Sequence, residues 1–355
     1  MARRNTSRIL TKRVGDKMRF RIRFSSVWTR IVGSTIAHHV ESFDECADRE
    51  LDFDVRFGGK IEVPEDCTDI DGTLVAKDTI AEINRSYKGA RWSYSMSGLD
   101  SDKLVCDVSA NALGYRYMAG TLVYLSFLLS SVRAGIPLVH ASAIEIDERG
   151  TVISARGGAG KTTLAMKAVD RGSGRIVSDN YVFLDQGRAL SYPAPLNLFS
   201  YNISDSVKRT LKQSTRLELM AKAALYRITL GKVKLFITPT MREILGDIVV
   251  PEARTSRLIL LIPTRSIASA EESDIEYAAD FITWNQRLEN SLYERALAAH
   301  AYQFPQGALG TLWSRYRGLV KERLRGFEKI TLMRIPEGPI TNEIAEFVWR
   351  AMNAE

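Results

Sequence analysis

A glycine-rich segment, framed by an apolar run and a helix-compatible run, places the strongest constraint on the fold of this chain. The segment reads Ala155-Arg156-Gly157-Gly158-Ala159-Gly160-Lys161-Thr162-Thr163. The apolar residues 152–154 precede it, and residues 163–169 follow it with side chains that favour a helix. A small residue, four further residues and Gly-Lys-Thr, placed between a strand and a helix, form the pattern of a phosphate-binding loop. We therefore predict that this segment binds a nucleotide.

The residue types in the loop explain how it could hold phosphate. Gly157, Gly158 and Gly160 allow successive backbone N–H groups to turn toward phosphate oxygens. Lys161 brings an ammonium group to the β- and γ-phosphates, and the hydroxyl of Thr162 can bind Mg²⁺. The helix that starts at Lys161 adds its unpaired N–H groups and the positive end of its dipole. The predicted nucleotide-binding residues are Gly157, Gly158, Ala159, Gly160, Lys161, Thr162 and Thr163.

Composition argues against several other classes of protein. Cys46, Cys67 and Cys106 are widely spaced, so a disulfide framework and a zinc knuckle are not expected, and a reducing cytoplasm fits best. The most apolar stretch, residues 117–132, is shorter than the roughly 20 residues of a membrane-spanning helix. No transmembrane segment and no secretory signal are predicted. At 355 residues, about two domains are expected.

Positive charge is concentrated at the N-terminus. Residues 1–30 contain ten Lys and Arg and one Asp, which gives them a net charge of +9, whereas the whole chain carries +7. Residues 18–24 alternate apolar and Arg side chains, which predicts a strand with an arginine face. Three interpretations stay open: a solvated tail leading into an edge strand, a basic patch for an acidic partner, or a transit peptide, which the alternation disfavours. No specific nucleic-acid motif accompanies the charge.

Hydrophobic periodicity divides the chain into a basic tail at 1–16, a β-rich lobe at 17–110 and an α/β domain at 111–355. In the lobe, strands are expected at 20–24, 51–57, 60–63, 92–96 and 104–108. Strands are then expected at 138–146, 151–154, 175–178, 258–263 and 330–335. Helices are expected at 111–133, 161–170, 204–227, 278–302 and 341–352. Trp284 and Trp349 lie in two of these helices and are predicted to be core residues.

The segments on either side of the loop carry a resemblance to a known family. Leu138-Val139-His140-Ala141-Ser142-Ala143 stands before the loop, and Gly174-Arg175-Ile176-Val177-Ser178-Asp179-Asn180-Tyr181 stands after it. With the loop between them, they resemble the catalytic core of the HPr kinase/phosphorylase family and, more distantly, PEP carboxykinase. The resemblance is specific over 136–185 and loose over 110–265. It implies an α/β P-loop kinase domain, here preceded by the β-rich lobe.

The resemblance also implies roles for individual residues. Asp179 is expected to act as base or orienter of the acceptor hydroxyl, or alternatively as a carboxylate behind Mg²⁺. Asn180 stands where the family has a second Asp and is predicted, with Thr162, to bind the metal. His140 is expected to contact Asp179 or the γ-phosphate, and the alternative is an ordinary core histidine. Arg242 is a further candidate to neutralise charge in the transition state.

These observations predict an ATP- and Mg²⁺-dependent kinase that phosphorylates a hydroxyl, most simply serine, on a peptide or small protein. The family's Glu-Val-Arg-Gly signature loop is not found, so an acceptor other than HPr is expected. The β-rich lobe would recognise the acceptor, and its arginine-lined strand would favour an acidic one. Two alternatives stay open: a kinase for a small metabolite, and a nucleotide-gated regulatory ATPase. The acceptor's identity, a homo-oligomeric state and a phosphorylase reaction are left open.

Overall fold

The computed structural model describes residues 8–25, 36, 40, 43–47, 50–172, 174–192, 213–228, 241 and 245–353. The chain divides into two compact units, residues 1–138 with 290–319, and residues 139–289 with 320–355. This division differs from the predicted domain boundary at residue 110. Residues 111–138 belong to the first unit, because the long helix they contain packs on the sheet of that unit.

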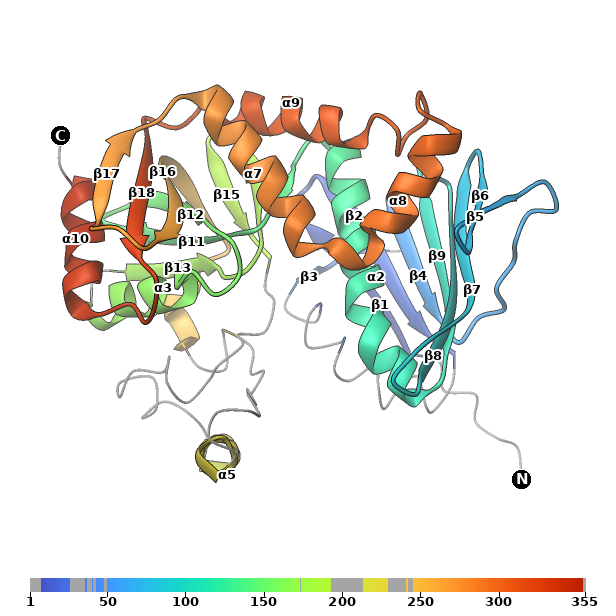
Figure 1. Cartoon of the computed structure of the whole chain (residues 1–355), viewed down its shortest axis with the longest axis horizontal. Coiled ribbons are helices and arrows are strands. Elements are labelled where there is room, and N and C mark those ends of the chain that lie inside the picture. Colours follow the sequence, from blue (N-terminus) through green and yellow to red (C-terminus); the bar gives the residue numbers. More distant parts are fainter. Residues whose placement is uncertain are drawn as a thin grey trace. The chain divides into compact units, whose positions relative to one another are not determined.

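A mixed sheet of nine strands, counted among the described residues, forms the centre of the first unit (Figure 1). The strands are β1 (Arg8–Val14), β2 (Met18–Phe24), β3 (Asp44–Glu45), β4 (Phe53–Phe57), β5 (Thr68–Ile70), β6 (Thr73–Ala76), β7 (Thr79–Tyr87), β8 (Ala90–Ser97) and β9 (Leu104–Ala110). Their order across the sheet is β3-β1-β2-β4-β9-β8-β7-β6-β5. The pairs β2–β4 and β4–β9 are parallel, and the other pairs are antiparallel.

Helix α2 (Ala112–Arg133) covers one face of this sheet. Asn111 caps its first turn by accepting a hydrogen bond from the N–H of Gly114 at 2.7 Å. The ring of Phe127 lies 4.7 Å from that of Phe20 and 4.8 Å from that of Phe53. The unit also contains α8 (Ser291–Gln303) and the beginning of α9 (Leu312–Leu324). Within the described ranges, no helix combines the length and the hydropathy that crossing a bilayer requires.

The N-terminal segments confirm one prediction and correct two. The alternation in β2 places Met18, Phe20, Ile22 and Phe24 in the core, as predicted. Residues 8–14, expected in a basic tail, form β1, which pairs with β2 along its whole length. The strand expected at 60–63 is wrong, because these residues have no regular structure.

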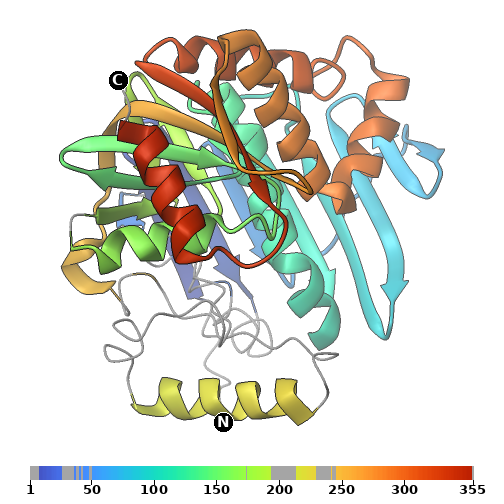
Figure 2. The same cartoon turned by 60° about the vertical axis from the view of Figure 1, so that its left-hand side comes forward.

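A second mixed sheet forms the centre of the second unit, and α3 and α10 lie on one of its faces (Figure 2). The strands are β10 (Leu138–Val139), β11 (Ala141–Ile146), β12 (Arg149–Ser154), β13 (Gly174–Ser178), β14 (Val182–Asp185), β15 (Arg188–Ser191), β16 (Glu252–Thr264), β17 (Ser269–Glu272) and β18 (Lys329–Pro336). The helices are α3 (Lys161–Asp170), α5 (Gln213–Ile228), η1 (Gly246–Ile248), α7 (Ile275–Glu289) and α10 (Asn342–Asn353). β16 pairs in parallel with β12 and with β18, and these central strands direct their carboxyl ends toward one edge.

The helix predicted over 278–302 is two helices, α7 and α8, separated at Asn290. Asn290 leaves the helical conformation, at φ −121° and ψ 35°. Its side-chain amide, which is buried, donates to the hydroxyl of Tyr124 at 3.4 Å. Asn favours such breaks because its amide can replace helical hydrogen bonds.

One of the two predicted core tryptophans is at the surface. Trp349 on α10 is buried, as predicted, but Trp284 on α7 is 58% exposed. Leu288, one turn further along α7, is exposed as well. The buried face of α7 instead carries Ala278, Ala279 and Ile282, together with two amide side chains. A helical repeat indicates that residues share a face, but it does not say which face is buried.

Candidate functional site

The glycine-rich loop, residues 155–160, joins the end of β12 to the start of α3, as the sequence predicts. Gly158 and Gly160 have φ angles of +79° and +94°, a region that favours glycine. A side chain at position 160 would also meet Ile340, because an added Cβ would lie 2.3 Å from its Cγ1. Gly160 occupies the N-cap of α3 and supplies no side-chain cap. The first N–H groups of α3 are therefore available to an anion.

Lys161 is buried in the floor of the loop. Its Nζ donates to the carbonyl oxygen of Ala155 at 2.6 Å and to that of Arg156 at 3.3 Å. Burial lowers the pKa of Lys161 to about 8, although the nearby carboxylates of Asp179 and Glu289 favour its charged form. The ammonium group is thus held beneath the loop by neutral carbonyls, where it can turn toward a stronger acceptor.

Asp179 follows β13 and is 1% exposed. One of its carboxylate oxygens accepts a hydrogen bond from Thr162 Oγ1 at 2.8 Å, and the other accepts one from Ser142 Oγ. The structure therefore brings together Asp179, Thr162 and Lys161, all predicted from the sequence. Ser142, on β11, is a site residue that the sequence reasoning missed. Its signal was its place on the strand that pairs with β13.

Asn180 adopts a left-handed conformation, with φ +68°. Asn tolerates this conformation better than most residues, because its short polar side chain adds little strain. Its carbonyl oxygen accepts a hydrogen bond from the N–H of Ala141 at 3.1 Å. The turn after Asp179 thus gives Asn180 a backbone role, and metal binding by its side chain stays a prediction.

His140 is 5% exposed and lies against α7. Its N–H donates to Gln286 Oε1 at 2.9 Å, and its Nδ1 lies 3.8 Å from Glu289 Oε1. Burial, assisted by the charge of Lys161, holds the pKa of His140 well below its usual value, so the ring is neutral at pH 7. The hydrogen bonds recorded for the described part of the chain do not link His140 to Asp179. The predicted contact between these two residues stays a prediction.

Three polar residues on one side of α7 complete the site, and the sequence reasoning missed all of them. Asn285 Nδ2 donates to the carbonyl oxygen of Ala155 at 3.0 Å and to that of His140 at 3.3 Å. Gln286 holds the N–H of His140, and the Glu289 carboxylate accepts a hydrogen bond from the N–H of Gly157. Asn285 and Gln286 are buried amides on a helix, which is itself a signal of a polar contact.

A cavity of about 400 Å³ lies beside the loop. Its walls are residues 156–159 of the loop and the carboxyl ends of β16 and β18. Ile262, Pro263, Ile335 and Pro336 make part of the lining apolar. An apolar wall next to a run of backbone N–H groups suits a ligand with a flat organic part and an anionic part.

The donor set at Asp179 fits Mg²⁺. The Thr162 hydroxyl and the Asp179 carboxylate are hard oxygen donors, which this cation prefers, and Mg²⁺ commonly shares such donors with substrate phosphates. Among the residues described, no group of three or more His, Cys, Asp or Glu side chains is placed to hold a metal. The candidate residue Arg242 lies outside the described residues.

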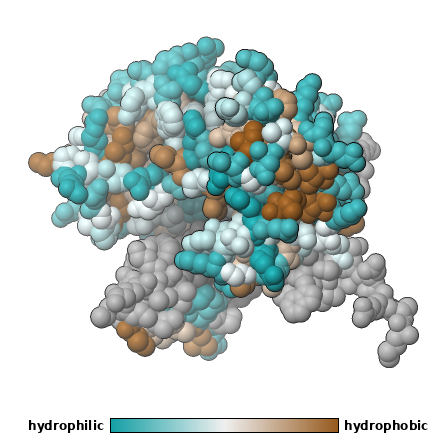
Figure 3. All heavy atoms as spheres, turned by 45° about the vertical axis from the view of Figure 1, so that its right-hand side comes forward, coloured by the Kyte–Doolittle hydropathy of each residue, from teal (hydrophilic) through white to brown (hydrophobic). Residues whose placement is uncertain are grey.

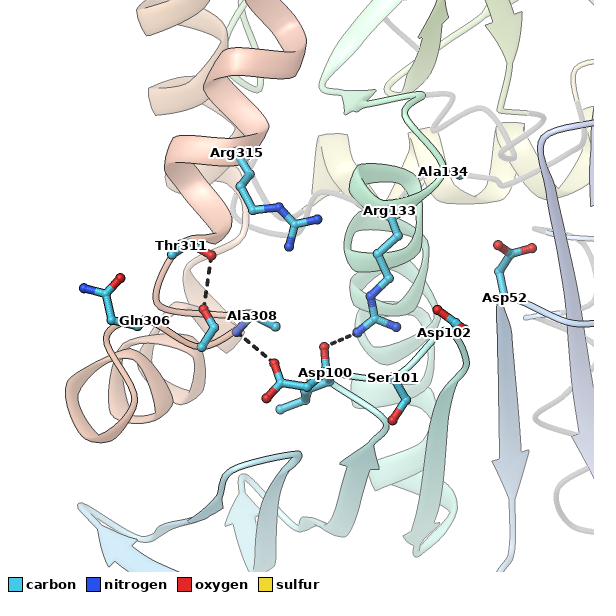
Figure 4. A pocket seen from close by; sticks show the side chains of 12 residues that line it. Asp52, Asp100, Ser101, Asp102, Arg133, Ala134, Gln306, Ala308, Thr311 and Arg315 are labelled. Atoms are coloured by element: carbon cyan, nitrogen blue, oxygen red, sulfur yellow. Dashed lines mark hydrogen bonds between the residues drawn. The ribbon is translucent and has the colours of Figure 1, made fainter.

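The first unit contains a separate cavity of about 570 Å³, shown in Figure 4. Arg133 and Arg315 project into it from two helices, and Arg133 extends toward the loop that carries Asp100 and Ser101. Arg133 Nη2 donates to the carbonyl oxygens of Gly98, at 2.9 Å, and Leu99. The Asp100 carboxylate accepts from the N–H of Ala308 at 3.1 Å. These two charged groups therefore hold together the loops that form the cavity.

The same unit carries a cluster of aromatic and basic residues at its surface, which we call the aromatic patch: Tyr87, Lys88, Trp92, Leu113, Arg116 and Tyr117. The ring of Tyr117 lies 5.5 Å from that of Tyr87 and 5.4 Å from that of Trp92. Leu113 is 55% exposed, and the basic side chains of Lys88 and Arg116 are exposed. Hydrophobic residues gather in patches on the largely hydrophilic face in Figure 3. Exposed apolar groups with a polar rim are typical of interaction surfaces.

The arginine face of β2 differs from this patch. Arg21 Nη2 lies 2.9 Å from Asp54 Oδ2, and Arg23 binds the same carboxylate. Asp54 is 1% exposed. Two of the arginines expected to attract an acidic partner therefore share one carboxylate within the unit, which halves the charge that they offer to a partner.

Comparison with known proteins identifies a distant structural similarity. No protein-family model matches the chain, and no curated protein matches it. Among solved structures, it is similar to the HPr(Ser) kinase/phosphatase from Coxiella burnetii, with 12% sequence identity over 61% of this chain and 87% of that chain. The TM-score is 0.28. The mixed α/β fold is given by the two sheets and their helices, and the function has to be inferred from the site itself.

Proposed function

We propose that this protein is an ATP- and Mg²⁺-dependent kinase of the HPr-kinase-like type that phosphorylates a hydroxyl group on a polypeptide. The observation that carries the proposal is the placement of Asp179 against Thr162, the second residue of the helix that follows the glycine-rich loop. A carboxylate here lies where a metal-bound phosphate and an attacking hydroxyl have to meet. A loop that serves only as a tight turn needs neither a buried lysine nor this carboxylate.

Lys161 and the backbone of the loop would bind the phosphates. The ammonium group exchanges the carbonyls of Ala155 and Arg156 for phosphate oxygens, which are stronger acceptors. Thr162 and Asp179 would hold Mg²⁺, and the ion supplies positive charge to the phosphates when it is bound. The apolar wall formed by Ile262 and Ile335 suits the base of the nucleotide.

Asp179 would also orient the acceptor and receive its proton. The hydroxyl oxygen forms a bond to the γ-phosphorus, the bond between that phosphorus and the departing ADP oxygen breaks, and the hydroxyl proton passes to Asp179. Ser142 and Thr162 fix the two carboxylate oxygens, so the group needs little rearrangement to act. This fixed geometry supports a role in orientation as well as in proton transfer.

The aromatic patch favours a polypeptide acceptor over a small metabolite. It offers exposed rings for apolar contacts and two exposed basic side chains, a combination that suits an acidic peptide or protein surface. The expectation for an acidic acceptor therefore moves from the arginine face of β2, where Arg21 and Arg23 are paired, to this patch. A regulatory ATPase would need no surface for a polypeptide acceptor and no carboxylate to orient its hydroxyl.

The test uses the full-length protein with γ-labelled ATP, Mg²⁺ and a lysate of its own host. We expect label on a polypeptide, and we expect Lys161→Ala to abolish both the labelling and the binding of ATP. Lys167→Ala is the matched control, because Lys167 lies on the same helix and contacts Asn342 instead of the loop. Label on a metabolite would favour the metabolite kinase, and release of free phosphate alone would favour the ATPase. ATP binding that survives Lys161→Ala would overturn the site assignment.

A further inference from the structure

We propose that Glu289 competes with nucleotide phosphate for the N–H of Gly157 and, once displaced, holds the imidazole of His140 in position. The inference rests on the proposed binding of nucleotide at the glycine-rich loop. It makes Glu289, the last residue of α7, a positioning residue of the site, more than 100 positions away from the loop in sequence.

The contact with Gly157 places a carboxylate where phosphate is expected. The Glu289 side chain accepts a hydrogen bond from the Gly157 N–H, and both of its oxygens lie 3.1 Å from the point where a Cβ of residue 157 would be. The N–H groups of glycine-rich loops bind anions through such hydrogen bonds. A carboxylate and a phosphate cannot share one N–H at close range, because their negative charges repel. Nucleotide binding must therefore displace Glu289.

His140 offers the displaced carboxylate a second partner. Its Nδ1 is buried, lies 3.8 Å from Glu289 Oε1 and has no hydrogen-bond partner among the described residues. A buried ring nitrogen without a partner is unfavourable, and a hydrogen bond requires an approach to about 3 Å. A shift of about 1 Å in the carboxylate would make that bond.

The bond would define which nitrogen of His140 carries the proton. The ring is neutral at pH 7, because burial holds its pKa well below the usual value. A carboxylate on Nδ1 keeps the proton there and leaves Nε2 as an acceptor, which suits the hydroxyl that is phosphorylated and does not suit Asp179 or the γ-phosphate. Asn285 and Gln286, on the same helix as Glu289, already fix the backbone of His140. Because α7 carries Glu289 and also holds the backbone of His140, a small movement of the carboxylate suffices to form the bond.

The contacts of Glu289 with Gly157 and with His140 predict that removing its carboxylate raises the affinity for nucleotide and lowers the rate of phosphoryl transfer. Without the Glu289 carboxylate, nucleotide meets no competitor at Gly157, so its affinity increases. Without the same carboxylate, the proton of His140 is no longer held on Nδ1, and Nε2 is no longer kept as an acceptor for the hydroxyl that is phosphorylated, so phosphoryl transfer slows. A residue with a purely structural role would lower both quantities together, and this difference makes the proposal testable.

The experiment compares the wild type with Glu289→Ala, Glu289→Gln and Glu276→Gln. It measures the equilibrium binding of a fluorescent ATP analogue and the steady-state transfer of phosphate from γ-labelled ATP to polypeptides of the host lysate. We expect Glu289→Ala to bind the analogue about tenfold more tightly, as for the loss of a charge-assisted hydrogen bond. We expect its turnover to fall about tenfold, as for a misplaced catalytic group. Glu276→Gln is the control. It removes a carboxylate that lies on the same helix but pairs with Lys321, so its affinity for the analogue and its turnover should stay within about twofold of the wild type.

Each outcome decides between this inference and the proposed function. A wild-type protein that binds no nucleotide overturns the proposed function, and this inference with it. A wild type that binds ATP, with Glu289→Ala and Glu289→Gln binding equally or more weakly, overturns the inference alone. Tighter binding with unchanged turnover overturns the role assigned to His140. Thermal unfolding reports whether Glu289→Ala is folded, and if it is not, Glu289→Gln, which keeps the size of the side chain, decides with the same expected directions.

Discussion

Each unit buries an aspartate to the same extent, but the two aspartates have different surroundings. Asp54 and Asp179 are each 1% exposed. Burial alone would raise the pKa of Asp54, but hydrogen bonds and charges from Arg21 and Arg23 hold it below its usual value. Asp179 accepts hydrogen bonds from two hydroxyl groups, and its charge favours the protonated form of Lys161.

This difference indicates which buried charges stabilise the protein and which serve its function. The carboxylate of Asp54 is matched by two guanidinium groups, so it has little capacity left for a ligand. Hydroxyl groups fix Asp179 without neutralising it, and such a buried charge retains its ability to bind a cation or accept a proton. The buried carboxylate of the first unit is therefore held by cations and stabilises the fold, whereas that of the second unit is held by hydroxyl groups, as the proposed chemistry requires. Replacing the same group in each unit tests this conclusion.

The largest expected effect is that of Asp179→Asn on transfer. The amide keeps the size of the carboxylate and can still pair with Ser142 and Thr162, but it cannot accept a proton. We expect phosphoryl transfer to slow about a thousandfold, as for the loss of a general base. ATP binding measured without Mg²⁺ should change little, because Lys161 and the loop contact the phosphates, and the free energy of unfolding should change by about 1 kcal/mol or less. Single-turnover transfer and equilibrium binding measure the two quantities, and equal loss of both would contradict the assignment of Asp179 as base.

The matching change in the first unit, Asp54→Asn, should act on stability instead. It leaves Arg21 and Arg23 facing each other without their shared carboxylate. A buried ion pair that loses one partner costs several kcal/mol, and the partial exposure of Arg23 reduces this to about 2–3 kcal/mol. Thermal unfolding of the two variants, run side by side, measures the difference. An unchanged midpoint for Asp54→Asn would remove the distinction between the units.

The sequence predicts the parts of this comparison that depend on local pattern. The strand, loop and helix around Lys161 follow from neighbouring residues, and the buried face of β2 follows from its alternation. The contacts of α7 could not be predicted from the sequence, because Gly157 and Glu289 are 132 positions apart and no local pattern joins them. The pairing of Arg21 and Arg23 with Asp54 was missed for the same reason. Local patterns define elements, but the neighbours of a charge depend on which elements pack together.

A smaller effect concerns pH and distinguishes Lys161 from an ordinary lysine. Its pKa is lowered to about 8, so its ammonium group loses its proton as pH rises through 8. Positive charge favours phosphate binding, and the affinity for ATP should therefore fall as pH rises. Between pH 7 and pH 9 we expect a loss of about tenfold. Binding titrations across this range measure it, and Lys161→Arg, which stays charged, should bind with little dependence on pH.

The smallest expected effect concerns the aromatic patch, where charged side chains of the first unit are exposed and, in the described part of the chain, not paired as they are at Asp54. Its basic side chains, Lys88 and Arg116, are exposed, so their charge is available to a partner. Leu113→Asp should raise the KM for the polypeptide acceptor a few fold, as for the loss of one apolar contact near basic groups. ATP binding should stay unchanged, because the glycine-rich loop belongs to the other unit. Ile9→Asp, at an exposed apolar position on β1 outside the patch, is the matched control. If both variants leave the KM unchanged, the patch does not bind the acceptor, and the recognition surface has to lie elsewhere on the protein.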